Sequence, residues 1–181
     1  MDKQDLRARF RPGEEVEPEH ASLVVESLFA WLSQRLPGTV SAFLAMPSEV
    51  DVSPLFERLP GWRWVLARVE ADRSMTFRDR AVPRETHPLG MGQPADAGPV
   101  IPLREIDVFL TPGLAFDRRG GRLGRGGGFY DRVLAERRTD SAAVGVTVSQ
   151  RVVESVPMEP HDEPVDWLAT EEAVIRCSTS R

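Results

Sequence analysis

The sequence has few of the residues that build disulfides and metal centres. Its 181 residues include a single cysteine, Cys177, and three histidines. One cysteine excludes an internal disulfide and any zinc site with several cysteine ligands. The chain also lacks an apolar stretch of membrane-spanning length, and its first residues show no hydrophobic segment typical of a secretory signal. We therefore expect a cytoplasmic protein with no membrane partner.

The chain also has fewer basic than acidic residues. The chain has 23 basic and 28 acidic residues, which gives a net charge of −5. Its basic residues gather at one glycine-rich stretch instead of covering a broad face, so we expect no nucleic-acid partner. The length and a hydrophobic content of 41% suit one domain over residues 1–181. We expect a monomer that acts on small molecules.

Hydrophobic periodicity predicts alternating helices and strands. Helices are predicted over residues 2–10, 19–36, 53–59 and 129–138, and strands over residues 40–46, 62–69, 74–80, 106–110, 142–148 and 165–170. Pro12 and Gly13 should end the first helix, and Ser53 and Pro54 resemble an N-cap and a first-turn proline. Residues 84–102, rich in proline and glycine, are predicted to form a long surface connection. The alternation indicates an α/β fold with a mainly parallel sheet, whose ligands bind beyond the carboxyl ends of the strands.

Half of the 14 glycines lie between Gly113 and Gly128. Glycines allow positive φ and let backbone N–H groups approach an anion that a Cβ would obstruct. Four arginines in the same stretch add donors suited to phosphate oxygens, namely Arg118, Arg119, Arg122 and Arg125. The alternative is a mobile, solvated linker, but apolar runs on both sides favour a loop held between packed elements. The stretch therefore predicts a phosphate site.

Two common nucleotide fingerprints do not fit this stretch. A Walker loop requires lysine after its second glycine, whereas Gly127 and Gly128 follow Gly126. A dinucleotide fingerprint that begins at Gly124 requires a third glycine where the chain has Phe129.

The stretch resembles the signature of the 5-formyltetrahydrofolate cyclo-ligase (methenyltetrahydrofolate synthetase) family. The matching segments are IDVFLTPGLAFD, RRGGRLGRGGG and FYD, in unbroken register over roughly 25 residues. Weaker matches lie elsewhere, in Lys3 to Arg7, in Glu49 to Asp51 and in PMEPHDEPVD at residues 157–166. The resemblance implies a three-layer α/β/α sandwich. It also implies ATP- and magnesium-dependent cyclisation of 5-formyltetrahydrofolate to 5,10-methenyltetrahydrofolate, with release of ADP and phosphate.

The resemblance also assigns roles to individual residues of this sequence. It implies catalytic roles for Arg125, Tyr130 and Asp131. It implies ATP contacts by Lys3, Arg7, Arg122, Leu123, Gly124, Arg125, Gly126, Gly127, Gly128, Phe129 and Tyr130. It implies folate contacts by Leu44, Glu49, Arg125, Gly126, Gly127, Gly128 and Phe129.

Magnesium would be held by Asp131 and Asp166, because carboxylate oxygens are the ligands that this ion prefers. Asp131 could also be a carboxylate that stabilises the first turn of its helix, and both roles are compatible. Asp166 stands between Val165 and Trp167, where a carboxylate is costly unless it is paired or metal-bound.

Several of these residues have a plainer interpretation. Glu49 could be a solvated charge at a strand end, and Lys3 and Arg7 could be ordinary cations of a terminal helix. We assign His161 no catalytic role.

The sequence also departs from the family pattern in ways that leave its function partly open. Position 127 is glycine where some relatives have lysine, and the first helix is short. Two alternatives remain: a different phosphate-ligand enzyme on the same scaffold, and a non-catalytic relative that binds folate or nucleotide.

Overall fold

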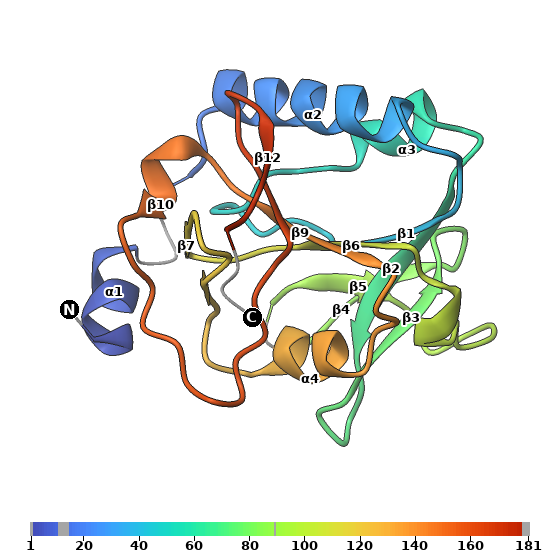
Figure 1. Ribbon diagram of the computed structural model, residues 1–181. Coiled ribbons are helices and arrows are strands. Elements are labelled where there is room, and N and C mark those ends of the chain that lie inside the picture. The colour runs from blue at the N-terminus through green and yellow to red at the C-terminus, as the bar shows by residue number, and fades with distance from the viewer. Residues whose placement is uncertain (1, 11–14, 89, 179–181) are drawn as a thin grey trace.

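The computed structural model describes residues 2–10, 15–88 and 90–178, and its centre is a seven-stranded sheet (Figure 1). The strands of this sheet are β1 (Thr39–Ala42), β2 (Arg63–Val69), β3 (Met75–Asp79), β6 (Val108–Thr111), β9 (Ala142–Val146), β11 (Trp167–Ala169) and β12 (Val174–Arg176). Their order is β12-β11-β9-β6-β1-β2-β3. β1 pairs in parallel with β2 and β6, and β9 with β6 and β11, whereas β3 and β12 are antiparallel edges. This confirms the predicted mainly parallel sheet.

Helices cover both faces of this sheet, which confirms the three-layer α/β/α sandwich (Figure 1). The helices are α1 (Lys3–Arg9), α2 (Pro18–Ser33), α3 (Pro54–Arg58) and α4 (Phe129–Ala135), with 3-10 turns η1 (Leu103–Glu105) and η2 (Ser149–Arg151). α2 and α3 lie on one face and α4 on the other. None of the helices in the described ranges is long and apolar enough to cross a bilayer.

Each face of the sheet has its own apolar core. α2 contributes Val24, Leu28 and Leu32, which repeat at the helical spacing of four residues and are fully buried. On the other face, Val133 and Leu134 of α4 pack in the same core as the buried ring of Phe109 from β6. Because both faces are covered, β1 and β6 are buried along their whole length, as expected for a parallel sheet.

The first half of the glycine-rich stretch forms a small second sheet. Its strands are β7 (Ala115–Asp117), β8 (Arg122–Leu123) and β10 (Val152–Val153), in the order β10-β7-β8. The buried Asp117 carboxylate accepts hydrogen bonds from the N–H groups of Arg119 and Gly121 at 2.9 Å, which closes the turn between β7 and β8. The stretch is thus a packed hairpin and not a solvated linker.

One local prediction is wrong and another is confirmed only in part. Residues 84–102 are not simply a surface connection, because β4 (Arg84–Thr86) and β5 (Gly92–Pro94) form a hairpin within them. This hairpin is held to β2 by the buried Gln93 side chain, whose Oε1 accepts a hydrogen bond from the Val69 N–H at 3.1 Å. Ser53 is the N-cap residue of α3 and Pro54 is its first residue, as predicted, but the Ser53 hydroxyl donates to Asp51 at 2.9 Å and not to the helix.

Some element boundaries differ from the prediction. For β1 the reason is that apolar side chains continue past the end of backbone pairing. β1 ends at Ala42, four residues before the predicted end, and the chain then leaves the sheet. α4 likewise ends at Ala135. The sequence also did not predict β7, β8, β10 or β12, and the predicted stop at Pro12 and Gly13 lies outside the described residues.

Candidate active site

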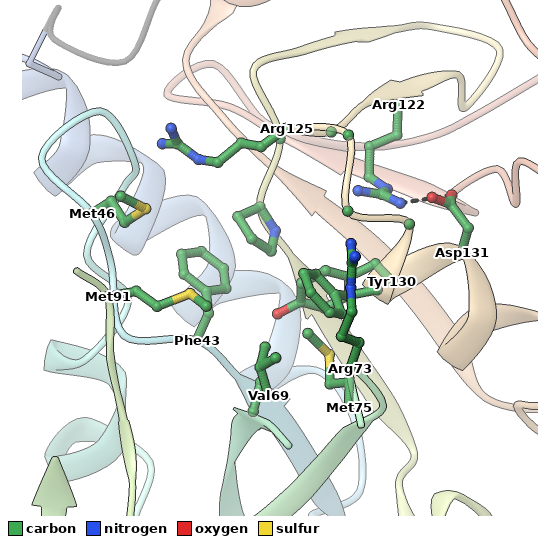
Figure 2. Close-up of a pocket in the computed structure, with 18 of the residues that line it drawn as sticks. Phe43, Met46, Val69, Arg73, Met75, Met91, Arg122, Arg125, Tyr130 and Asp131 are labelled. Carbon is green, nitrogen blue, oxygen red and sulfur yellow. Dashed lines mark hydrogen bonds and ion pairs between the residues drawn. The ribbon is translucent and has the colours of Figure 1, made fainter. Parts of the chain in front are cut away.

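A cavity of about 1040 Å³ lies beyond the carboxyl ends of β1, β2 and β6. Ligands of open parallel sheets bind at this edge. One side of the cavity, here termed the glycine-loop wall, consists of residues 122–131. The other side, termed the apolar wall, consists of Phe43, Met46, Val69, Met75 and Met91 (Figure 2). The cavity thus joins a polar surface and an apolar one.

Backbone conformation makes glycine necessary at two positions of the glycine-loop wall. Gly126 has φ of 99°, and Gly128, which is the N-cap of α4, has φ of 63°. Residues other than glycine rarely adopt such φ angles. A Cβ on Gly126 would find open space on the cavity side, with Arg7 Cζ the nearest atom at 3.9 Å. The main chain at Gly126 is therefore accessible to a ligand, as in backbone sites for anions.

Arg122 and Asp131 form an ion pair inside the glycine-loop wall (Figure 2). The Arg122 Nη2 donates to Asp131 Oδ1 at 2.7 Å, and both side chains are largely buried. The guanidinium carbon also lies 5.6 Å from the centre of the Tyr130 ring. Asp131 therefore fixes the Arg122 guanidinium at the edge of the cavity, since a charge-assisted bond of this kind restricts both groups.

Arg125 crosses from the glycine loop to the chain segment that follows β1. Its Nη2 donates to Ser48 Oγ at 2.8 Å and to Glu49 Oε1 at 3.3 Å. The Glu49 Oε2 accepts the N–H of Met46 at 3.1 Å, so this carboxylate is fixed from both sides. Glu49 therefore lies where the two walls meet and is not a freely solvated charge.

Helix α1 brings two further cations to the cavity. Asp2 and Asp5 form a capping box at its start, and its buried Leu6 packs against the chain around β8. Arg7 Nε donates to the carbonyl of Gly124 at 3.0 Å, which ties the helix to the glycine loop. This contact shows that the cation at position 7 has a specific structural role.

Lys3 is held by two carboxylates from a distant part of the chain. Its Nζ lies 2.5 Å from Asp162 Oδ2 and 2.8 Å from Glu159 Oε2. Burial lowers the pKa of this ammonium, but the hydrogen bonds to Asp162 and Glu159 outweigh that effect and raise its pKa overall. His161 stands beside the same two carboxylates, and the three side chains could in principle hold a cation. The Lys3 ammonium already supplies a positive charge there.

Tyr130 places its hydroxyl in the cavity, toward the side where Phe43 and Val69 lie (Figure 2). Burial and the negative charge of Glu49 raise the pKa of this phenol well above its ordinary value, and the positive charge of Arg122 offsets them only in part. The hydroxyl is therefore neutral at physiological pH. It can donate a hydrogen bond, but it is a poor base.

The structure brings all but one of the predicted site residues to this cavity. Those that line it are Lys3, Arg7, Leu44, Glu49, Arg122, Leu123, Gly124, Arg125, Gly126, Gly127, Gly128, Phe129, Tyr130 and Asp131.

Asp166 does not line the cavity, so the structure does not bring the predicted metal pair together. The two oxygens of Asp166 lie 3.0 and 2.8 Å from Arg137 Nη2, and Oδ2 also accepts the N–H of Ala143 at 2.8 Å. Arg137 and Ala143 thus satisfy the carboxylate that we expected to be either paired or metal-bound, and both of its oxygens are used.

The residues of the apolar wall were not among the predicted site residues. Phe43 and Met46 follow β1, Val69 ends β2, Met75 begins β3, and Met91 precedes β5. Each of these residues is an ordinary apolar residue in its own segment. The sequence contains one signal for this wall. The apolar run after β1 continues past the end of the strand, so its last residues must contact something other than the sheet.

Comparisons with known proteins point to one protein family. The family description "5-formyltetrahydrofolate cyclo-ligase family" matches residues 3–171. A 5-formyltetrahydrofolate cyclo-ligase of Escherichia coli K12 is 36% identical over 143 residues, which cover 73% of this chain and 77% of the relative. The chain belongs to this family.

Solved structures agree with the fold. A 5,10-methenyltetrahydrofolate synthetase from Aquifex aeolicus has a TM-score of 0.80 and 29% identity, over 100% of this chain and 95% of the other. A 5,10-methenyltetrahydrofolate synthetase from Mycoplasma pneumoniae has a TM-score of 0.77 and 23% identity, over 94% and 99%, and supports the fold alone.

The cyclo-ligase family implies magnesium, and the residues of this chain fit that ion only in part. Both hydrogen bonds that Asp131 accepts, from Arg122 and from the N–H of Glu163 at 3.3 Å, use Oδ1. Across the described ranges no partner meets Oδ2, which can serve as a hard ligand. Asp166 would have to leave Arg137 before it could take the same role.

Proposed function

We propose that this protein uses ATP to convert 5-formyltetrahydrofolate into 5,10-methenyltetrahydrofolate, with ATP phosphates at the glycine-loop wall and the folate against the apolar wall. The observation that carries the proposal is the joining of these two walls in one cavity by Glu49 and Arg125. The family reaction needs both a phosphoryl donor and the flat pterin ring of the folate within reach of each other.

The reaction begins with a poor electrophile, because a formamide carbon is unreactive and its oxygen is a poor leaving group. Transfer of the terminal phosphoryl group of ATP to the formyl oxygen breaks the bond to ADP and gives an imidate phosphate. The nitrogen at position 10 of the folate then attacks the formyl carbon and loses its proton, and the formyl oxygen leaves with the phosphoryl group as hydrogen phosphate when the ring closes. Positioning and charge neutralisation are the main tasks of a protein in such a transfer, so no nucleophilic side chain is required.

The glycine-loop wall suits the phosphoryl donor. Backbone N–H groups at Gly126, where the main chain is accessible, would donate hydrogen bonds to phosphate oxygens. The Arg122 guanidinium is held by Asp131 at the edge of the same cavity. Lys3 and Arg7 would add positive charge from α1. Magnesium would neutralise the charge that develops during transfer, and Asp131 would help to hold it through Oδ2.

The apolar wall suits the folate. The carboxylate of Glu49 would accept hydrogen bonds from the donor edge of the pterin, with Leu44 packed against the ring. Arg125 now pairs with this carboxylate, so it would have to share Glu49 with the pterin or turn toward the phosphates when the substrates bind. The neutral hydroxyl of Tyr130 would donate a hydrogen bond to an oxygen at the reacting centre.

The test is to mix purified protein with 5-formyltetrahydrofolate, ATP and magnesium and to follow the ultraviolet absorbance of the methenyl product. We expect turnover that requires all three components. Equal rates without ATP would contradict phosphoryl activation. If folate binds without turnover, the protein is a non-catalytic relative. If phosphate is released from ATP with no response to folate, it is an enzyme for another substrate.

A further inference from the structure

Arg73 lies at the tip of the turn between β2 and β3 and lines the rim of the cavity. Its φ is 65°, a left-handed conformation that residues other than glycine rarely adopt. A hydrogen bond of 2.9 Å from its N–H to the Glu70 carbonyl closes the turn. Figure 2 shows the guanidinium directed back over the cavity beside Tyr130, although the residue is exposed. The strained backbone thus turns a surface arginine toward the site.

The Arg73 guanidinium has no acidic partner within the described part of the chain. The nearest carboxylate of the same turn, Glu70, accepts hydrogen bonds from Arg68 Nε at 2.9 Å and from Arg78 Nη2 at 3.1 Å. Asp72 accepts from the backbone and hydroxyl of Ser74. By contrast, Lys3 of α1 and Arg122 and Arg125 of the glycine-loop wall each pair with a carboxylate of the protein. An arginine directed at a cavity without such a partner is suited to an anionic ligand.

The turn is fixed to the glycine loop through Arg132. One Arg132 nitrogen donates to the Arg73 carbonyl at 2.9 Å, and another donates to the Gly127 carbonyl at 3.2 Å. The same guanidinium lies 5.3 Å from the centre of the Phe129 ring. Arg73 therefore keeps a defined position relative to the phosphate end of the cavity, even though it stands at the rim.

We infer that Arg73 binds a carboxylate of the glutamyl tail of the folate, an inference that rests on the proposed function. The tail is the only part of 5-formyltetrahydrofolate that carries carboxylates, and as its most polar part it should remain near water. Arg73 is exposed and stands on the apolar side of the cavity, opposite α1. The phosphates have other cations nearer to the glycine loop. Arg73 is therefore a specificity residue that selects substrates with an acidic tail.

The experiment compares Arg73→Gln, Arg73→Lys and the parent on two substrates. One is 5-formyltetrahydrofolate, and the other is the N-methylamide of 5-formyltetrahydropteroic acid, which keeps the pterin, the nitrogen at position 10 and the aryl ring but has no carboxylate. Arg104→Gln is the matched control, because Arg104 is also exposed but lies outside the cavity. Initial rates give kcat and KM for each substrate and for ATP.

We expect Arg73→Gln to raise KM for 5-formyltetrahydrofolate about tenfold, with kcat and KM for ATP nearly unchanged. Arg73→Lys should lie between this variant and the parent because it keeps the charge but loses the fork-shaped donors. On the methylamide, all variants should match the parent. An equal rise of KM on both substrates, or no rise on either, would overturn the assignment. A rise confined to KM for ATP would also overturn it and would place Arg73 at a phosphate.

Equilibrium titration separates this inference from the proposed function. Binding of the two folates without ATP, followed by calorimetry, reports on Arg73 whether or not product forms. Absence of turnover in the parent would refute the proposed cyclo-ligase activity. Tail-dependent binding that Arg73→Gln weakens would still support the carboxylate site, whereas equal binding of both folates by parent and variant would refute it.

Discussion

The two walls of the cavity are built in opposite ways. The glycine-loop wall comes from ten consecutive residues, 122–131. Their charged side chains pair with each other or with the segment after β1, and the Gly124 carbonyl accepts a hydrogen bond from Arg7 of α1. The apolar wall comes from the ends of β1 and β2, the start of β3 and the chain before β5. The first wall is a continuous motif fixed by hydrogen bonds, whereas the second exists only because the sheet brings separate segments together.

This difference separates the two tasks of the proposed reaction. Phosphate recognition needs backbone N–H groups and cations at fixed positions, which a short segment with left-handed glycines can supply. Recognition of a pterin and its aryl tail needs mainly shape and apolar area, which several segments can provide jointly. Changes on the first wall should therefore act on ATP and turnover, and changes on the second on folate alone.

The largest effect is expected at Asp131, in contrast to Asp166. Asp131→Asn weakens the hold on Arg122 and removes the charged oxygen proposed for magnesium, so turnover should fall by at least a hundredfold, in line with several kcal/mol for metal stabilisation of phosphoryl transfer. Asp166→Asn should instead lower thermal stability through its contacts with Arg137 and Ala143. Turnover against magnesium concentration and thermal unfolding measure the two effects. A magnesium response that shifts equally in both variants would return Asp166 to the metal site.

Glu49 lies where the two walls meet, and its substitution tests whether folate binding can be weakened without a change in ATP binding. Glu49→Gln keeps the shape but removes a charged acceptor, so folate binding should weaken by roughly 1.5–3 kcal/mol while ATP binding stays nearly intact. The control is Glu171→Gln, because Glu171 also accepts hydrogen bonds, from Ser149, but lies outside the cavity. Equal folate affinity of parent and Glu49→Gln in a titration would remove Glu49 from the site.

Gly126 separates the anion site from an ordinary turn. Gly126→Ala places a Cβ at φ of 99°, and Gly90→Ala does so at φ of 86° in the turn between β4 and β5, where Gly90 itself does not line the cavity and a Cβ would meet nothing within 4 Å. Both variants should lose about 1–2 kcal/mol of stability from the left-handed backbone. Only Gly126→Ala should also weaken ATP binding. The prediction fails if ATP affinity, measured by calorimetry, is unchanged at Gly126 or falls equally at Gly90.

Met91 gives the smallest effect and tests the apolar wall. Met91→Ala removes contact area from the proposed folate side, so KM for folate should rise about fivefold, equivalent to about 1 kcal/mol of apolar contact. KM for ATP should not change. Met91→Leu conserves most of the volume and should stay close to the parent. An effect of Met91→Ala on ATP would show that the walls do not divide the substrates as proposed.

Local pattern was enough for much of the fold. The apolar spacing of α2, the buried runs of β1 and β6, and Pro54 at the start of α3 each follow from the periodicity of their own segment. The β4–β5 hairpin was not predicted because it depends on a tertiary contact. Gln93 is polar yet buried, because the N–H of Val69 on another strand needs its oxygen, and no local pattern contains that partner.

The same distinction applies to the site. The sequence of residues 122–131 was enough to predict the glycine-loop wall, because closely spaced glycines and arginines are a local signal for an anion site. Only the tertiary structure decided that Asp131 pairs with Arg122 at the cavity while Asp166 pairs with Arg137 away from it, since neither arginine adjoins its aspartate in the sequence. It alone also decided that Phe43, Val69 and Met91 share one surface, because the side of a strand end that a residue faces depends on which segments the sheet places beside it.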